Sequence, residues 1–132
     1  MTKRFLKILL LDDSVENIYL IERELKREEL HCTIISVANK IDFISAMLDF
    51  DPDVVLSDNF LLEFNAIEAL SLSRVLNGKI PFILLNGGVG EDSTRKFLEL
   101  GGDGYLAKDA LADLAKVILI TLDKYKITNE YL

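Results

Sequence analysis

Four apolar runs of this 132-residue chain each end in polar side chains that could take part in chemistry. The central run, residues 54–57, ends in Asp58. The polar residues that follow the other three runs are Asp12 with Asp13, Asn86, and Lys108. Carboxylates bind hard divalent cations, and an aspartate can act as a nucleophile towards a phosphoryl group. Whether these residues form a site depends on where the fold places the ends of the runs.

The apolar runs are typical of strands covered on both faces, and amphipathic spacing predicts helices between them. The expected strands are residues 5–11, 33–37, 54–58, 82–85 and 104–108, and the expected helices are residues 14–28, 41–49, 66–76, 91–100 and 110–125. In the first helix, the expected buried stripe is Val15, Ile18, Ile21 and Leu25. We expect one domain over residues 1–125, followed by a loose C-terminal tail over residues 126–132.

Strict alternation of strands and helices predicts an α/β fold, with a parallel sheet, right-handed crossovers and helices on both faces. For five strands we expect the flavodoxin-like, doubly wound order 2-1-3-4-5, in which the chain reverses direction between strands 1 and 3. Ligands bind beside the carboxyl ends of the strands at such a reversal. We therefore expect Asp12, Asp13 and Asp58 to lie together there, with Asn86 and Lys108 on the flanking strands.

Three carboxylates at adjacent strand ends repel one another, since two unit charges about 4 Å apart cost roughly 4 kcal/mol at an effective dielectric constant of 20. Lys108 offsets part of this repulsion, and a cation such as Mg²⁺ would offset more. A metal held in this way can also bridge a phosphoryl group. We therefore interpret Asp58 as the candidate nucleophile, Asp12 and Asp13 as the metal ligands, and Lys108 as the partner of the phosphoryl oxygens.

The acidic pair, Asp58 at the end of its strand, and residues 104–108 around the lysine occur in the order seen in a known family. In these motifs the chain resembles the receiver domains of two-component response regulators, from Ile8 to about Tyr125. The resemblance implies that Asp58 is the phosphoacceptor and that Lys108 contacts the phosphoryl group. It also implies an Mg²⁺ site made by Asp12, Asp13, Asp58 and the backbone carbonyl of Phe60.

The resemblance further implies a signalling role without enzymatic activity beyond the chain's own phosphorylation and dephosphorylation. The expected partners are a sensor histidine kinase or phosphotransfer protein, and a downstream protein target that contacts the fourth helix, fifth strand and fifth helix. Tyr105 would be the aromatic side chain whose rotamer reports activation. Asn86 stands where receivers have Thr or Ser, so the alternative function is an interaction module with a receiver fold that works without phosphorylation.

The composition excludes several other classes of protein. A net charge of -7 argues against a nucleic-acid-binding face, because such a face needs clustered lysines and arginines. The single histidine and single cysteine cannot supply a disulfide framework, a Cys/His zinc site or a His-dependent triad. The apolar runs are far shorter than a membrane span, and we expect a cytoplasmic protein that does not bind membranes.

Overall fold

The computed structural model describes residues 5–58, 64–86 and 91–131, except for the side chains of residues 86, 91 and 126–131. The elements in chain order are β1 (Leu6–Leu11), α1 (Val15–Arg27), β2 (Cys32–Val37), α2 (Lys40–Asp49), β3 (Val54–Asp58), α3 (Ala66–Leu76), β4 (Phe82–Asn86), α4 (Glu91–Glu99), β5 (Gly104–Ala107), the short 3₁₀ helix η1 (Lys108–Asp113) and α5 (Leu114–Tyr131).

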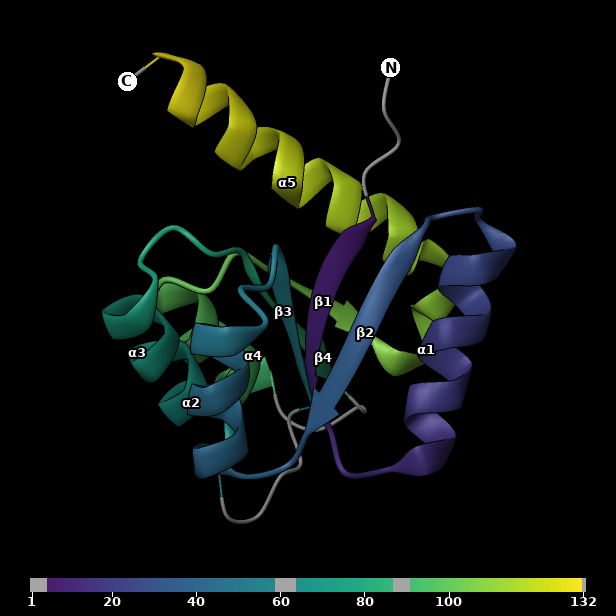
Figure 1. Ribbon diagram of the computed structural model, residues 1–132, viewed down its shortest axis with the longest axis horizontal. Coiled ribbons are helices and arrows are strands. Elements are labelled where there is room, and N and C mark those ends of the chain that lie inside the picture. The colour runs from purple at the N-terminus through teal and green to yellow at the C-terminus, as the bar shows by residue number, and fades with distance from the viewer. Residues whose placement is uncertain (1–4, 59–63, 87–90, 132) are drawn as a thin grey trace.

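The five strands form one parallel sheet in the order β2-β1-β3-β4-β5. The helices α1 and α5 cover one face of the sheet, and α2, α3 and α4 cover the other (Figure 1). The fold predicted from the sequence is therefore confirmed, including the strand order and the reversal between β1 and β3. Because the strands are buried on both faces, alternate side chains of each strand belong to two separate cores.

Successive side chains of a strand point to opposite faces of the sheet. The core under α1 and α5 and the core under α2, α3 and α4 therefore contain alternate residues of the strands. On the α1 and α5 side the buried strand residues are Ile8, Leu10, Val54, Leu56, Ile83, Leu85 and Leu106. On the other side they are Leu9, Leu11, Val55, Phe82 and Leu84, with Phe97 of α4 packed 5.5 Å from the Phe82 ring. These two rows hold the strands in a single register, because a shift by one residue would exchange the cores.

Polar side chains define where several helices begin. The Ser14 hydroxyl accepts a hydrogen bond from the Asn17 N–H at 3.2 Å and caps α1. Asn39 caps α2 by accepting from the N–H of Asp42 at 2.8 Å, and its amide donates back to the Asp42 carboxylate. Asn65 caps α3 through Glu68 in the same way. Such reciprocal bonds satisfy amides that have no partner within the helix.

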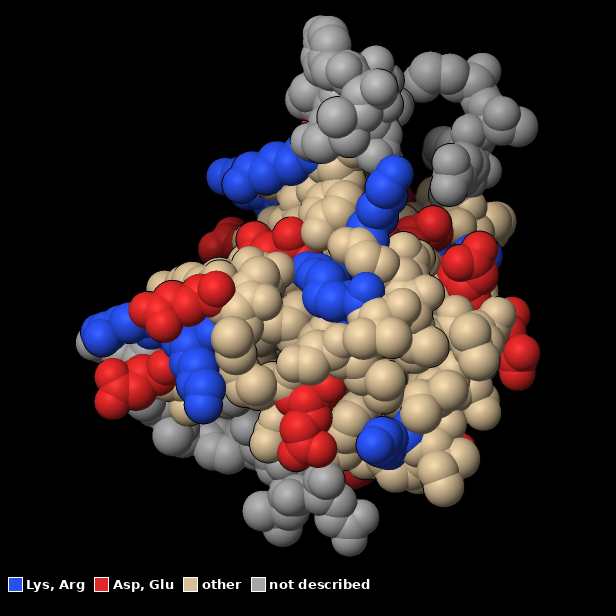
Figure 2. Space-filling model, turned by 90° about the vertical axis from the view of Figure 1, so that its left-hand side faces the viewer, with Lys and Arg blue, Asp and Glu red and all other residues tan. Residues whose placement is uncertain are grey.

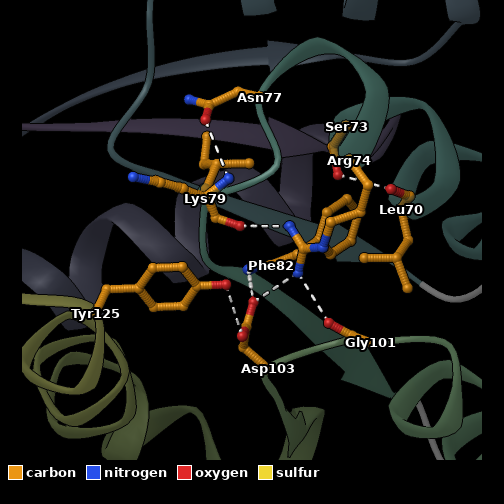
Figure 3. Close-up of polar contacts among 10 residues, drawn as sticks. Leu70, Ser73, Arg74, Asn77, Lys79, Phe82, Gly101, Asp103 and Tyr125 are labelled. Carbon is orange, nitrogen blue, oxygen red and sulfur yellow. Dashed lines mark hydrogen bonds and ion pairs between the residues drawn. The ribbon is translucent and has the colours of Figure 1, made fainter. Parts of the chain in front are cut away.

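A network centred on Asp103 joins α3, the turn after α4, and α5 to the amino end of β4 (Figure 3). Because the strands are parallel, this is the end of the sheet opposite Asp58. One Asp103 oxygen accepts hydrogen bonds from the Phe82 N–H at 2.8 Å and from Arg74 at 2.9 Å. The other accepts from the Tyr125 hydroxyl at 2.8 Å. The Arg74 guanidinium also donates to the carbonyls of Ile80 and Gly101, so α3, the turn after α4, and α5 are connected through one carboxylate.

The ends of several elements differ from the sequence-based prediction. β1 begins at Leu6, β2 begins at Cys32, and β5 ends at Ala107, so that Lys108 begins η1 instead of closing a strand. The last helix starts at Leu114 and continues to Tyr131, through residues predicted as a loose tail. Residues 126–131 contain neither glycine nor proline, and nothing in their sequence stops a helix.

One apolar residue predicted to be buried lies on the surface: Val15 of α1 is 81% exposed. The rest of the predicted stripe faces the core: Ile21 and Leu25 are buried and Ile18 is half-buried. Val15 lies in the first turn of α1, beyond the edge of the core that this helix covers, which explains the difference.

The face formed by α2, α3 and α4 carries small groups of both charges around uncharged surface (Figure 2). Basic and acidic side chains alternate on this face, and the described residues there form no continuous basic stripe of the kind that contacts with a phosphate backbone require. None of the described helices combines the length and the apolar character that a membrane crossing demands.

Candidate functional site

At the carboxyl ends of three strands, a polar residue stands two positions after a buried leucine. The pairs, each two residues apart, are Leu10 and Asp12, Leu56 and Asp58, and Leu106 and Lys108. Side chains two residues apart along a strand lie on the same face. The register pairs Leu11 with Ser57, so Asp12 and Asp58 are level on neighbouring strands.

Asp58 and Lys108 form an ion pair. The Lys108 Nζ lies 2.9 Å from the Asp58 Oδ1, and the two side chains are 25% and 7% exposed, respectively. The lysine comes from the start of η1 on the edge of the sheet and reaches the carboxylate across β4. A charge-assisted contact of this length within a largely buried site offsets part of the charge on Asp58.

Asp12 is the second buried carboxylate of the site and is 2% exposed. Its Oδ1 accepts a hydrogen bond from the Ser14 N–H at 2.8 Å, and its Oδ2 accepts one from the Asn17 side chain at 3.3 Å. Burial raises the pKa of Asp12, and the charge on Asp58 raises it further. The hydrogen bonds and the nearby Lys108 oppose this rise in pKa without cancelling it. The two carboxylates therefore repel each other, as predicted.

Asp13 does not join these two residues in a buried cluster, because its side chain is exposed. Within residues 5–58, 64–86 and 91–131, no three histidine, cysteine, aspartate or glutamate side chains come close enough to hold a metal ion. Asp12 and Asp58 are therefore the two buried carboxylates at this end of the sheet, and the metal site with Asp13 stays a prediction. Phe60, whose carbonyl was the remaining predicted ligand, lies outside the described residues.

A pair of carboxylates still suits Mg²⁺, which is usually held by one or two carboxylates and by phosphate oxygens and keeps several waters. Asp12 and Asp58 supply hard oxygen atoms whose mutual repulsion a cation would relieve. The donor chemistry thus fits the predicted cation, and its binding stays a prediction.

Asn86 lies on β4, the strand next to β3, and Tyr105 lies on β5, the edge strand beyond β4. Tyr105 lies in β5 and is 51% exposed. Asn86 is the last residue of β4, and its backbone pairs with Ala107, directly before Lys108. Its side chain lies outside the described part of the structure. The backbone therefore brings this position to the lysine side of the site, while the switching roles of both residues stay predictions.

Sequence reasoning missed the polar partners of Asp12. Ser14 and Asn17 are not among the predicted site residues, although both contact the carboxylate. An aspartate directly before a capped helix is a usable signal, since the first amides of a helix favour a negative charge.

The parallel sheet in the order 2-1-3-4-5 is the fold that the resemblance to receiver domains implies, and Asp12, Asp58 and Lys108 lie at its carboxyl end. A solved response regulator receiver domain protein (CheY-like) from Methanospirillum hungatei JF-1 superposes with a TM-score of 0.80 and 21% sequence identity, over 95% of this chain and 99% of that one. The resemblance to receiver domains is therefore confirmed in fold.

Two proteins are also similar in sequence. The chemotaxis protein CheY of Halobacterium salinarum is 27% identical over 116 residues, which cover 82% of this chain and 95% of CheY. The transcription factor SKN7 of Saccharomyces cerevisiae is 27% identical over 120 residues, which cover 91% of this chain but only 19% of SKN7. No protein-family model matches the chain.

Proposed function

We propose that this chain is a phospho-accepting receiver module of two-component signal transduction and that Asp58 is the residue phosphorylated. The observation that carries the proposal is the ion pair between Asp58 and Lys108, which lies next to a second buried carboxylate at the reversal point of the sheet. A purely structural ion pair does not need the adjacent Asp12, whose charge works against it.

In the proposed reaction, a carboxylate oxygen of Asp58 forms a bond to the phosphorus of the donor. The P–N bond of a phosphohistidine donor breaks, and its electron pair leaves with the imidazole, which takes up a proton. Lys108 already lies against the carboxylate and can follow the added charge onto the phosphoryl oxygens. Phosphoryl transfer depends mainly on such positioning and charge neutralisation.

Within the same proposal, Asp12 and Asp58 hold Mg²⁺, with the exposed Asp13 and the carbonyl of Phe60 as further predicted ligands. The cation supplies neutralisation of the developing phosphoryl charge. The hydrogen bonds from Ser14 and Asn17 fix the orientation of the Asp12 carboxylate, so that its remaining lone pairs are presented in one geometry.

The proposed signal leaves through the surface of α4, β5 and α5. Exposed apolar side chains occur on and next to these elements, and they are Leu98, Leu100, Tyr105, Leu119 and Ile120. Exposed apolar groups of this kind are typical of surfaces that contact another protein. The expected partner at this surface is a downstream protein target. The expected donor of the phosphoryl group is a histidine kinase or a phosphotransfer protein.

Incubation with Mg²⁺ and acetyl phosphate tests the proposal. Intact mass spectrometry should show one added phosphoryl group on the wild-type chain and none on Asp58→Asn. The matched control is Asp49→Asn, which removes an exposed carboxylate at the end of α2 and should leave the adduct unchanged. A wild-type chain that stays unmodified, while a known receiver is modified under the same conditions, would refute the assignment of Asp58.

The alternative is a receiver-like interaction module that works without phosphorylation. Asn86 favours it, because this position lies beside Ala107 and Lys108, where a larger amide replaces the expected hydroxyl. NMR shift mapping with and without beryllofluoride distinguishes the two functions. Changes at Tyr105 and α4 that are small in the wild type and large in Asn86→Thr would show that the amide limits switching. Absence of any beryllofluoride effect in both proteins would favour the interaction module.

A further inference from the structure

The edge strand β2 has none of the usual features that prevent pairing with another strand. It lies at the edge of the sheet nearest the viewer, and among the described residues it pairs only with β1 (Figure 1). Its sequence, CTIISV, contains no charge, proline or glycine. Natural edge strands usually carry lysine, proline or a bulge, or are very short. The opposite edge, β5, has only four residues and is followed directly by Lys108.

The hydrogen bonds of β2 show which of its backbone groups face outwards. The carbonyls of His31 and Val37 accept from the N–H groups of Leu6 and Asp12 on the β1 side. Because backbone direction alternates along a strand, the odd-numbered residues of β2 face β1. The N–H and C=O groups of Cys32, Ile34 and Ser36 therefore face away from the sheet.

A groove of about 590 Å³ runs beside this edge, between β2 and α1. Its lining residues are Phe5, Glu22, Lys26, Glu29, Leu30, His31, Cys32 and Ile34. The walls near the strand are apolar, while the α1 side alternates in charge, with Lys26 between two glutamates. The edge is thus open on its α1 side, next to groups that can pair with charges on another surface.

We propose that β2 pairs antiparallel with the β2 strand of a second copy of this chain, about a two-fold axis at Ile34. The outward-facing groups then meet as Cys32 with Ser36, Ile34 with its own copy, and Ser36 with Cys32. The intervening positions pair Thr33 with Ile35, a β-branched combination that stabilises sheets. No two charged residues lie opposite each other in this register, so the strand is complementary to itself.

The absence of charge on β2 favours a second copy as the occupant. Each chain carries a net charge of -7, so two copies repel through most of their surface. The uncharged β2 edge places no like charges opposite each other at the contact, and the groove beside it carries both signs of charge, through Lys26 and two glutamates. A closed, isologous pair of this kind is the commonest form of soluble oligomer. The pair leaves the β5 edge and the Asp58 site open.

Light scattering coupled to size exclusion tests the association. Wild-type chain should show the mass of a dimer at submillimolar concentration and dissociate on dilution. Ser36→Pro removes one outward N–H at an exposed position of the edge, where proline is tolerated, and should give a monomer. Ser36→Ala keeps that N–H and should remain dimeric. A wild-type monomer at all concentrations, or a dimer that Ser36→Pro leaves intact, would overturn the proposal.

Cross-linking tests the register independently of any loss of stability in the proline variant. In a Cys32→Ser background, Ile34→Cys places two thiols directly opposite each other, at a Cα separation of about 5.5 Å that suits a disulfide. Thr33→Cys in the same background places its thiols two residues out of register. Mild oxidation should therefore produce a covalent dimer of the Ile34→Cys protein and little of the Thr33→Cys protein. Equal cross-linking of both, or of neither, would contradict the two-fold axis at Ile34.

Discussion

Replacing Lys108 by methionine would expose the electrostatic balance of the site. Methionine keeps much of the aliphatic stem and removes the charge that lies 2.9 Å from Asp58. Two carboxylates then remain, at 2% exposure for Asp12 and 7% for the Asp58 side chain, without their cation. We expect Lys108→Met to lower the free energy of unfolding in the absence of divalent cations.

The size of this effect follows from the burial of the pair. Removing one partner of a fully buried ion pair costs roughly 3–5 kcal/mol. Because Lys108 is 25% exposed, solvent screens part of the interaction, and a loss of about 2–3 kcal/mol is expected. Asp58→Asn removes the carboxylate charge that needs compensation. The double variant should therefore be more stable than the sum of the two single changes predicts, by about 1 kcal/mol or more.

Urea unfolding of four proteins, at neutral pH with a chelator present, measures this coupling. The proteins are the wild type, Lys108→Met, Asp58→Asn and the double variant. Repeating the series with millimolar Mg²⁺ should stabilise Lys108→Met more than the double variant, since a cation bound only by the folded chain adds stability by mass action. Additive effects, or a Lys108→Met protein as stable as the wild type, would refute the view that the lysine compensates two buried charges.

Three further changes test other parts of the structure. Burial, followed by the hydrogen bond to Asp103, raises the pKa of Tyr125 from 10.0 to about 12. The raised pKa means that Tyr125 contributes fully to the free energy of unfolding below pH 10.0 and that this contribution is lost as the pH rises to about 12. Urea unfolding should show this fall in the free energy of unfolding of the wild type and not of Tyr125→Phe. A Cβ at Gly102 would overlap the Phe97 ring, so Gly102→Ala should lower the free energy of unfolding by about 1–3 kcal/mol, and unchanged stability would show that the ring moves without cost. Arg74→Ala removes one of the hydrogen-bond donors of the partly buried Asp103 carboxylate and the guanidinium donor of two carbonyls, and it should cost about 2 kcal/mol in the same assay. Full recovery by Arg74→Lys would contradict the importance of the forked guanidinium geometry.

The order of strands and helices could be predicted from the sequence because it depends on local patterns. Short apolar runs and helical spacing act within a few positions along the chain. Strict alternation then leaves very few parallel topologies, and the predicted order is the observed one. The positions of Asp12, Asp58 and Lys108 at one end of the sheet follow from the same reasoning.

The limits of individual elements were less predictable. Lys108 was predicted to end a strand but begins a 3₁₀ helix, and α5 continues to Tyr131. Local sequence is compatible with either outcome at these positions, because neither carries a strong stop signal. Val15 matches the helical spacing of its neighbours but lies beyond the core, and spacing alone contains no information on where a core ends.

The sequence by itself determined the class of fold and which carboxylates lie at its carboxyl end, because both depend on periodicity and on the direction of parallel strands. Only the tertiary structure decided which carboxylates are buried together: Asp12 joins Asp58 and Asp13 does not. It also decided that Arg74 and Tyr125, which are far apart in the sequence, both donate hydrogen bonds to Asp103. Such contacts depend on the register and packing of distant elements, and no local pattern of residue types specifies them.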